Sequence, residues 1–500
     1  MSQLSQTGVA AAPIVVVLLL LALRVRSLRA GLAGLATAVL AAAAVFRPTS
    51  DEVAAAVASL GPTVLEVALI LFGGVTLAVV MAGTGAREHI AGWLERTATA
   101  SDRLPAILLL VFGLTPFMES VTGFGLGVVI TAPLLIRMGL TPVKAVVAGL
   151  LGLVLVPWGS LGPGTLVAAQ LGGQDFADLG YWSALLSLPV LVVSMVTVLV
   201  VVRPRATITP RPTTPLVTTT PPRTAIPARP TATLLTTCAA IVVVQWSALV
   251  GANALLGTAP AGVIASAAVI LLLLGISRVR HGPLPPISRE LVGALAPFGV
   301  LLLGILAVTV GLRLSGTPPG LAWLDSPAVW VNVAALVALR TTATPRPAAA
   351  RMLGQALATW VPVAGNAVAF MMIGIVMATA GMAAHLAQSA AGIGGGFLAL
   401  IPLVGALGGY LTGSNTGAAA MFSTATTAAA AGLGADTLVA LAGQNVAGSF
   451  AIIVSPPRIA LAVGVVMAAG EHLPAQATRT LATAVTAVSV ILGGAVWVLA

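Results

Sequence analysis

Charged residues are scarce in this chain, and cysteine is almost absent. Only 7% of the 500 residues are charged and 58% are hydrophobic, whereas a soluble domain has roughly 25% charged residues. No globular core could hide this much apolar surface, so the composition excludes a soluble protein and indicates a polytopic membrane protein. The single cysteine, Cys238, excludes an intrachain disulfide and a cysteine-rich metal site.

Acidic residues are outnumbered by basic ones, 13 to 23, which gives a formal net charge of +10. In a soluble chain this excess would suggest a nucleic-acid partner. Here the arginines fall in short loops between apolar runs, a pattern typical of cytoplasmic loops in membrane proteins. We therefore expect a lipid bilayer and no nucleic acid as the macromolecular environment.

Apolar runs long enough to cross a membrane, about 20 residues each, recur along the whole chain. The first run has no basic residue before it and is followed by Arg24, Arg26 and Arg29, the opposite charge order from a cleaved signal peptide. We interpret it as a transmembrane helix with its N-terminus outside. The expected spans are 9–23, 31–46, 62–83, 143–170, 181–202, 233–252, 259–277, 291–310, 323–340, 358–380, 437–469 and 480–499.

The longest hydrophilic segment divides the chain into two halves. Residues 203–232 are rich in proline, threonine and arginine and show no apolar period, which predicts an extended cytoplasmic linker. It separates a first half, 1–202, from a second half, 233–500. Placing the basic loops 24–29, 203–229, 278–289 and 340–351 in the cytoplasm then constrains the remaining segments.

Two apolar regions, 104–137 and 390–432, are interrupted by glycine, proline and polar residues. If the basic loops all lie in the cytoplasm, the first region must enter and leave on the cytoplasmic side and the second on the external side. We therefore predict two re-entrant hairpins. Each is followed by a span with a proline-containing break, near 157–165 (the first break) and near 455–458 (the second break). The order of parts predicts an inverted repeat, which in secondary transporters places discontinuous helices at the bilayer midplane. A channel would not need the duplication.

Intramembrane charges are the best functional signal in such a chain. Glu119 lies in "FMESVTGFG", deep in an apolar context, and is predicted to carry a proton because removal from water disfavours the charged form of a carboxyl group. The alternative is a neutral, hydrogen-bonded structural acid. Arg458 follows the "SPP" of the second break and is predicted to bind a substrate carboxylate, or else to reach the cytoplasmic interface. Glu66 is expected to be structural.

The tips of the two hairpins carry polar groups and close-approach glycines. Tight turns alone would explain one such tip, but two matching tips, each followed by a matching break, favour a substrate site. The predicted substrate-binding residues are Thr122, Gly123, Phe124 and Gly125 in the first tip, Ser414, Asn415 and Thr416 in the second, and Ser160, Ser455 and Arg458 in the breaks.

Motifs for cofactors, metals and catalysis are missing. The glycines of "GFGLG" lack the acid and the soluble βαβ unit of a dinucleotide site, "GIGGGF" lacks a following lysine, and the four histidines are scattered. We therefore expect no cofactor, no metal and no catalytic residue. The intramembrane amides Asn366, Gln444 and Asn445 are expected to form interhelical hydrogen bonds.

Three segments resemble the bacterial L-lactate permease family, within the ion transporter superfamily. "FMESVTGFGLGVVITAPLLIRMGL" is similar to the family's Glu-Gly-Ala-Ala-Gly-Phe-Gly-Ala-Pro segment and its apolar continuation. "LTGSNTGAAAMF" resembles Leu-Thr-Gly-Ser-Asp-Thr-Ser-Ser-Asn-Ala-Leu-Phe, and "IIVSPPRIALA" resembles the Ile-Ser-Pro-Gln-Ser-Ile-Ala-Ile segment. The order and spacing agree over most of residues 9 to 499.

The resemblance implies a multi-pass carrier in the bacterial plasma membrane that takes up L-lactate, glycolate and related 2-hydroxy monocarboxylates with a proton. It also allows a homodimer, since superfamily members are often dimers. The chain departs from the family's pattern: Asn415 replaces aspartate, Gly152 and Leu153 replace Asn-Thr, Ile452 replaces lysine and Arg458 replaces serine. These departures leave a sodium-coupled carboxylate carrier open as an alternative. An intramembrane enzyme or a channel is disfavoured.

Overall fold

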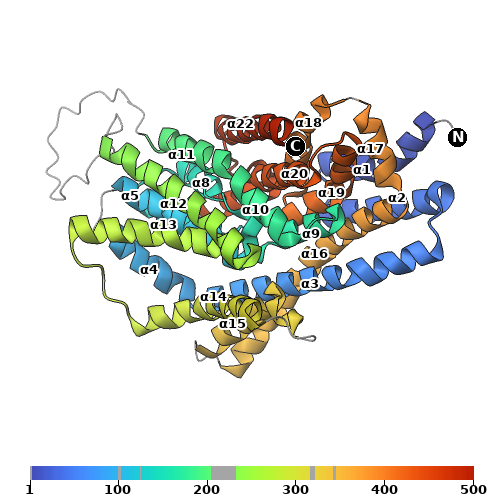
Figure 1. Ribbon diagram of the computed structural model, residues 1–500. Coiled ribbons are helices and arrows are strands. Elements are labelled where there is room, and N and C mark those ends of the chain that lie inside the picture. Colours follow the sequence, from blue (N-terminus) through green and yellow to red (C-terminus); the bar gives the residue numbers. More distant parts are fainter. Residues whose placement is uncertain are drawn as a thin grey trace.

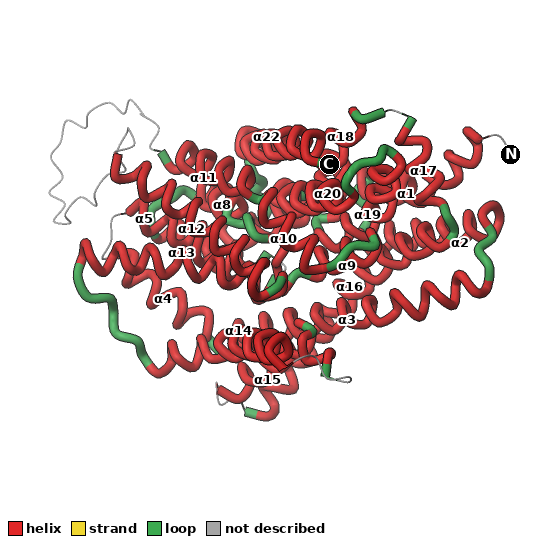
Figure 2. The backbone as a smooth tube through the Cα atoms, in the orientation of Figure 1, coloured by secondary structure: helices red, strands yellow, loops and turns green. Residues whose placement is uncertain are grey.

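The computed structural model describes residues 3–99, 103–123, 125–203, 232–315, 321–341, 345–392 and 394–500. The expected linker, 203–232, lies almost wholly outside the described residues, and so does Phe124. Within them the chain forms helices and no strands, joined by short loops (Figures 1 and 2). The prediction of an all-helical polytopic fold is confirmed.

The helices of the first half are α1 (Gln3–Ala22), α2 (Ser27–Ala41), η1 (Ala42–Phe46), α3 (Ser50–Gly83), α4 (Ala86–Thr99), α5 (Arg103–Leu108), η2 (Leu109–Leu114), α6 (Thr115–Thr122), α7 (Leu126–Arg137), α8 (Pro142–Leu151), η3 (Val156–Leu161), α9 (Pro163–Gly172), α10 (Phe176–Leu186) and α11 (Leu188–Val202).

Those of the second half are α12 (Ala232–Leu256), α13 (Thr258–His281), α14 (Arg289–Ser315), η4 (Ala322–Asp325), α15 (Pro327–Thr341), α16 (Arg346–Thr379), α17 (Met382–Ala391), α18 (Gly396–Thr412), α19 (Asn415–Gly432), α20 (Thr437–Ala451), η5 (Ile452–Val454), α21 (Pro456–Val466) and α22 (Ala475–Leu499).

Ten helices in the described part of the chain are long and apolar enough to cross a membrane, or eleven if the bent pair α10–α11 is one span. About twelve spans were expected. The expected span 143–170 is divided into α8, η3 and α9, and the expected span 323–340 holds only the 15-residue α15. Residues 103–122, expected as one arm of a hairpin, form a segment of spanning length.

Polar caps begin several helices at the ends of apolar runs. The Thr49 side chain accepts a hydrogen bond from the backbone of Glu52, whose carboxylate accepts one from the Thr49 backbone, so α3 starts with a capping box. Asp175 caps α10 and Asp436 caps α20 by accepting backbone N–H groups of the first helical turn, without a capping box. A cap of this kind contributes roughly 1 kcal/mol.

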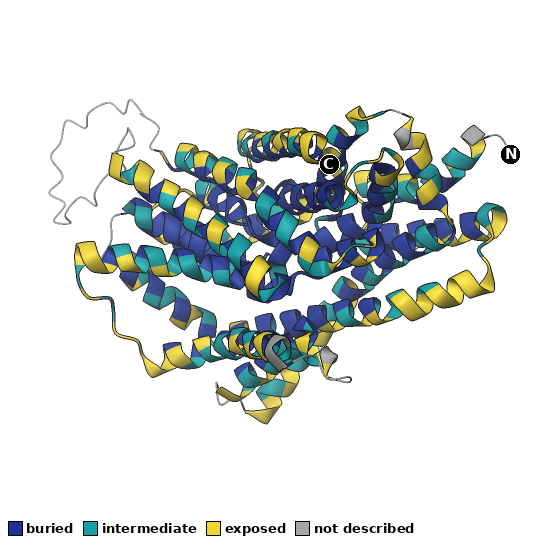
Figure 3. Ribbon diagram, in the orientation of Figure 1, coloured by how far each residue is buried: buried dark blue, intermediate teal, exposed yellow. Residues whose placement is uncertain are grey.

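The packing brings each hairpin against the broken helix of the other half. α19, the return arm of the second hairpin, packs on α9, and α21 packs on α7 and α8. The long helices α3 and α16 pack against each other, and α16 also packs against α2 and α19. Buried residues gather where these elements meet, while the outer helices expose apolar side chains, as a lipid-facing surface requires (Figure 3).

Candidate functional site

The first tip, of which the structure describes Thr122, Gly123 and Gly125, joins the end of α6 to the start of α7. Gly123 has φ +68° and Gly125 has φ +80°, conformations that glycine adopts without steric cost. The turn folds the Glu119 side chain back, so that both of its carboxylate oxygens accept the Gly125 N–H, at 3.1 and 2.9 Å. Glu119 is 2% exposed. The tip therefore holds one buried carboxylate at the start of α7.

Arg458, from the second half of the chain, lies against this carboxylate. Its Nη1 is 3.8 Å from Glu119 Oε1, and the two side chains are 13% and 3% exposed. A Cβ at Gly125 would lie 2.4 Å from the same Nη1, so the guanidinium approaches the tip only because residue 125 is glycine. Buried charges are stable when they are paired, which accounts for this contact between an acid and a base far apart in sequence.

The second break positions Arg458. Ser455 is the N-cap of α21, and its hydroxyl accepts the Arg458 N–H at 3.4 Å. The two prolines that follow Ser455 occupy the first turn of α21, where a missing N–H costs nothing. The arginine thus projects from the first turn of α21, which begins directly after the buried Ser455.

The first break contains a strained turn beside the first tip. Ser160 and Leu161 have φ +45° and +66°, values that non-glycine residues rarely adopt and that cost roughly 1–3 kcal/mol each. The Ser160 side chain is 2% exposed, and its hydroxyl has no hydrogen-bond partner. A Cβ at Gly123 would lie 2.8 Å from the Ser160 Cβ, so the break and the tip are in close contact.

The second tip (residues 412–417) turns at Gly413, with φ +63°, and α19 begins after it. The Ser414 hydroxyl caps α19 by accepting the Gly417 N–H at 3.3 Å. The Asn415 amide donates to Asn445 Oδ1 at 3.0 Å, and Asn445 donates in turn to hydroxyls of α9 and α10. Asn415 is therefore hydrogen-bonded through Asn445 of α20 to α9 and α10, which satisfies a polar group that lipid could not.

One cavity of about 660 Å³ joins the two tips and both breaks. Of the predicted site residues, those that line it are Glu119, Gly123, Ser160, Ser414, Asn415, Thr416 and Arg458. Thr122, Gly125 and Ser455 do not line it: the Thr122 hydroxyl donates to the Met118 carbonyl, and the other two hold Glu119 and Arg458 in place. Phe124 lies outside the described residues.

The same cavity has lining residues that sequence reasoning did not select. The polar and charged ones are Arg26, Ser27 and Arg29 at the start of α2, Asn366 from α16 and Thr412 from α18. The arginines follow the first span, where basic residues also serve as topology signals, so their pattern gave no separate indication. Ser27 Oγ and Asn366 Oδ1 are buried without a hydrogen-bond partner, as is Ser160 Oγ. Three unpartnered polar atoms from three elements line one cavity, which suits a polar ligand.

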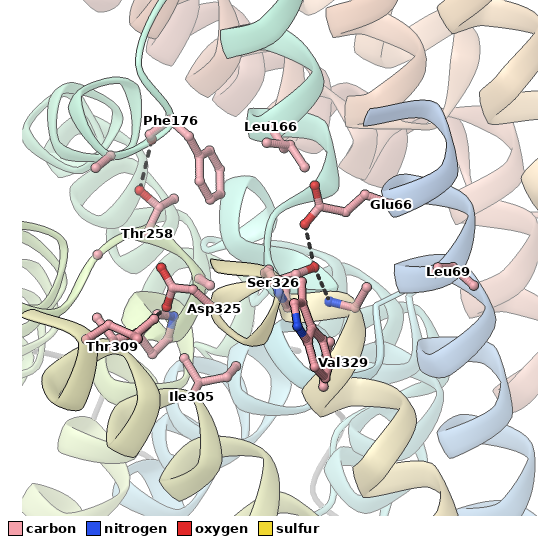
Figure 4. Close-up of a pocket in the computed structure, with 18 of the residues that line it drawn as sticks. Glu66, Leu69, Leu166, Phe176, Thr258, Ile305, Thr309, Asp325, Ser326 and Val329 are labelled. Carbon is pink, nitrogen blue, oxygen red and sulfur yellow. Dashed lines mark hydrogen bonds between the residues drawn. The ribbon is translucent and has the colours of Figure 1, made fainter. Parts of the chain in front are cut away.

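A second cavity, of about 800 Å³, lies between α3, α10, α13, α14 and α15 (Figure 4). Its charged lining residues are Glu66 and Asp325, and none of the described residues that line it is basic. The Ser326 hydroxyl donates to Glu66 at 2.5 Å, and the Thr309 hydroxyl donates to Asp325 at 2.7 Å. This cavity is the larger of the two. Its two carboxylates have no cation beside them in the described lining, so they would repel an anionic ligand.

Within the described residues no group of three or more histidine, cysteine, aspartate or glutamate side chains could hold a metal ion. The groups that the cavity between the tips offers to a ligand are an ion pair, hydroxyls, amides and backbone groups. These can bind a small anion by charge and by hydrogen bonds.

Comparison with known proteins agrees with the resemblance of the three segments. The profile of the L-lactate permease family matches residues 7–227 and 315–492, which is most of the chain and includes both tips and both breaks. The unmatched stretch between them contains α12, α13 and most of α14. A comparison with curated proteins finds no match. The chain therefore belongs to the L-lactate permease family, a family of membrane transporters.

Proposed function

We propose that this protein is a proton-coupled carrier of L-lactate, glycolate and related 2-hydroxy monocarboxylates in a bacterial plasma membrane. The observation that carries the proposal is the ion pair between the buried Glu119 and the partly buried Arg458 in the wall of the cavity. The pair places a group that can bind a proton beside a group that can bind a carboxylate.

The charges of the ion pair link the binding of the proton to the binding of the substrate carboxylate. While Glu119 is ionised, it compensates the guanidinium of Arg458, whose nearest nitrogen is 3.8 Å away. A proton on Glu119 removes that negative charge and leaves the guanidinium free to pair with the substrate carboxylate. Each ligand then favours binding of the other, and the linkage is reciprocal. One proton and one monocarboxylate together carry no net charge across the membrane.

The rest of the substrate would meet the unpartnered polar atoms. The Ser160 hydroxyl and Asn366 Oδ1 both line the cavity and lack partners, so they are available to the 2-hydroxyl group. Ile452 and Arg458 line the same cavity. In the family that the chain resembles, position 452 is lysine and position 458 is serine. Since both positions line one cavity here, we infer that the positive side chain has moved from 452 to 458 within the same site.

The arrangement of the two halves supports alternating access. The tip of each half lies beside a break, and all four segments contribute to one cavity. We propose that the hairpins enter from opposite faces as an inverted repeat, which would let the same site open outward and then inward.

Uptake of radiolabelled L-lactate into proteoliposomes, with and without an inward proton gradient, tests the proposal. We expect the gradient to accelerate uptake. Glu119→Gln should lose gradient-driven uptake and retain lactate–lactate exchange, because the amide cannot release a proton but leaves the cavity intact. Uptake that ignores the gradient and requires sodium would establish the sodium-coupled alternative, and non-saturating conductance in a planar bilayer would indicate a channel.

A further inference from the structure

The turn between α1 and α2 places two exposed arginines, Arg26 and Arg29, in the lining of the cavity. In contrast to these two, Arg458 is partly buried and Glu119 is buried. A solute that enters from water would therefore meet Arg26 and Arg29 before it reaches the ion pair.

Neither arginine has an acidic partner among the described residues. The two ion pairs recorded there join Arg137 to Glu95 and Arg458 to Glu119. The charged lining residues of the cavity are thus three arginines and one glutamate, with the excess of positive charge in the two unpaired side chains. A groove lined by one sign of charge attracts the opposite ion and raises its local concentration.

The start of α2 adds neutral donors to these charges. α2 begins at Ser27, and the preceding Arg26 makes no side-chain cap, so no side chain caps the first turn of the helix. The buried Ser27 hydroxyl also lacks a partner. Asn366 lines the cavity from α16, which packs against α2. Ser160 lines the same cavity; it is buried, and its hydroxyl has no hydrogen-bond partner.

We propose that Arg26, Arg29 and the first turn of α2 form a second anion subsite, which holds the substrate carboxylate before it passes to Arg458. The subsite rests on the proposed function for the identity of its ligand. It captures carboxylates by long-range attraction, so its contribution should fall as salt screens the charges.

The chain supplies a matched control in the same turn. Arg24 is also exposed and basic, but it does not line the cavity. If these arginines only orient the first span, Arg24→Gln should have the same effect as Arg26→Gln or Arg29→Gln. If they bind substrate, the cavity-lining pair should differ from Arg24.

The test is the kinetics of L-lactate uptake by proteoliposomes at ionic strengths of roughly 0.01 and 0.15 M, where the screening length falls from about 30 to about 8 Å. We expect Arg26→Gln/Arg29→Gln to raise KM about tenfold at low salt, to leave Vmax within about twofold and to flatten the salt dependence. Arg26→Lys/Arg29→Lys should keep most of the wild-type KM and salt dependence, because the positive charges remain. Arg24→Gln should match the wild type. An unchanged KM, or equal effects of all three arginines, overturns the subsite.

A binding measurement separates failure of the subsite from failure of the proposed function. Thermal unfolding of the purified protein is followed with L-lactate and with inorganic phosphate as probes. Anions should stabilise the wild type and Arg24→Gln more than the double glutamine variant. If lactate uptake is absent but this difference persists, the proposed substrate is wrong and the anion subsite stands. If the variants respond alike to both probes, the subsite is wrong.

Discussion

The two large cavities share walls but differ in charge. On α3, Leu71 lines the cavity between the tips, while Glu66 and Leu69 line the other one; on α9, Gly164 lines the first and Leu166 the second. The first cavity has three arginines and one glutamate, and the second has two acids and no base. The helices thus separate two chambers of opposite sign.

The difference lies in how each carboxylate is satisfied. Glu119 faces a guanidinium and a backbone N–H, while Glu66 accepts a hydrogen bond from the Ser326 hydroxyl. A proton on Glu119 changes the charge that Arg458 presents to a ligand, and a proton on Glu66 frees no cation among the described residues that line its cavity. The acid with a cationic partner is therefore the one that we propose to couple a proton to an anion, although its cavity is the smaller.

Removal of Arg458 should have the largest effect. In Arg458→Gln the Glu119 carboxylate stays buried without its cation, and breaking such a pair costs about 3–5 kcal/mol. We expect proton-driven lactate uptake to fall at least about a hundredfold, with a lower melting temperature. Glu119→Gln/Arg458→Gln should recover stability but not uptake, since neither charge remains buried. A single variant that transports normally would show that Arg458 does not bind substrate.

The sequence predicted the parts of the charged cavity better than their contacts. Polar residues are conspicuous in an apolar chain, so both tips, both breaks, Glu119 and Arg458 could be selected from composition and spacing. Each charge was assigned its own role, because nothing in the sequence reveals that α21 packs on α7 and α8. The all-helical fold was predictable because apolar runs of spanning length can be recognised from the local sequence alone.

Other features could not be predicted from the pattern. Arg26 and Arg29 follow the first span like any topology signal, and Ser27 resembles an ordinary helix residue. Asn366 was expected to form an interhelical hydrogen bond, but its Oδ1 has no partner. Only tertiary packing of α2 on α16 shows that all four line one cavity. In the expected span 143–170 a proline-containing break was predicted near 157–165, where Gly162 and Pro163 start α9 after a left-handed turn. The earlier end of α8, at Leu151, was not predicted, because average hydropathy does not detect such a local effect.

Removal of the Ser160 hydroxyl should have an intermediate effect. This oxygen is buried and has no partner in the protein, so Ser160→Ala removes no internal hydrogen bond and should leave the melting temperature unchanged or slightly raised. If the hydroxyl binds substrate, KM for lactate should rise several-fold, by the roughly 1 kcal/mol of one hydrogen bond. Propionate, which lacks the 2-hydroxyl group, is the matched substrate, and the uptake of lactate and propionate is compared. Equal loss for both would assign Ser160 to the carboxylate instead.

Glu66→Gln should have the smallest effect, and it applies the same chemical change to the other cavity. A glutamine carbonyl can still accept the Ser326 hydroxyl, so the contact at 2.5 Å needs no rearrangement. We expect KM, Vmax and the response to a proton gradient to stay within about twofold of the wild type, since one neutral hydrogen bond is retained. Glu119→Gln is the matched control in the same uptake assay. If Glu66→Gln also abolished gradient-driven uptake, the acidic cavity would take part in proton transfer, and the sign of its charge would no longer separate it from the transport site.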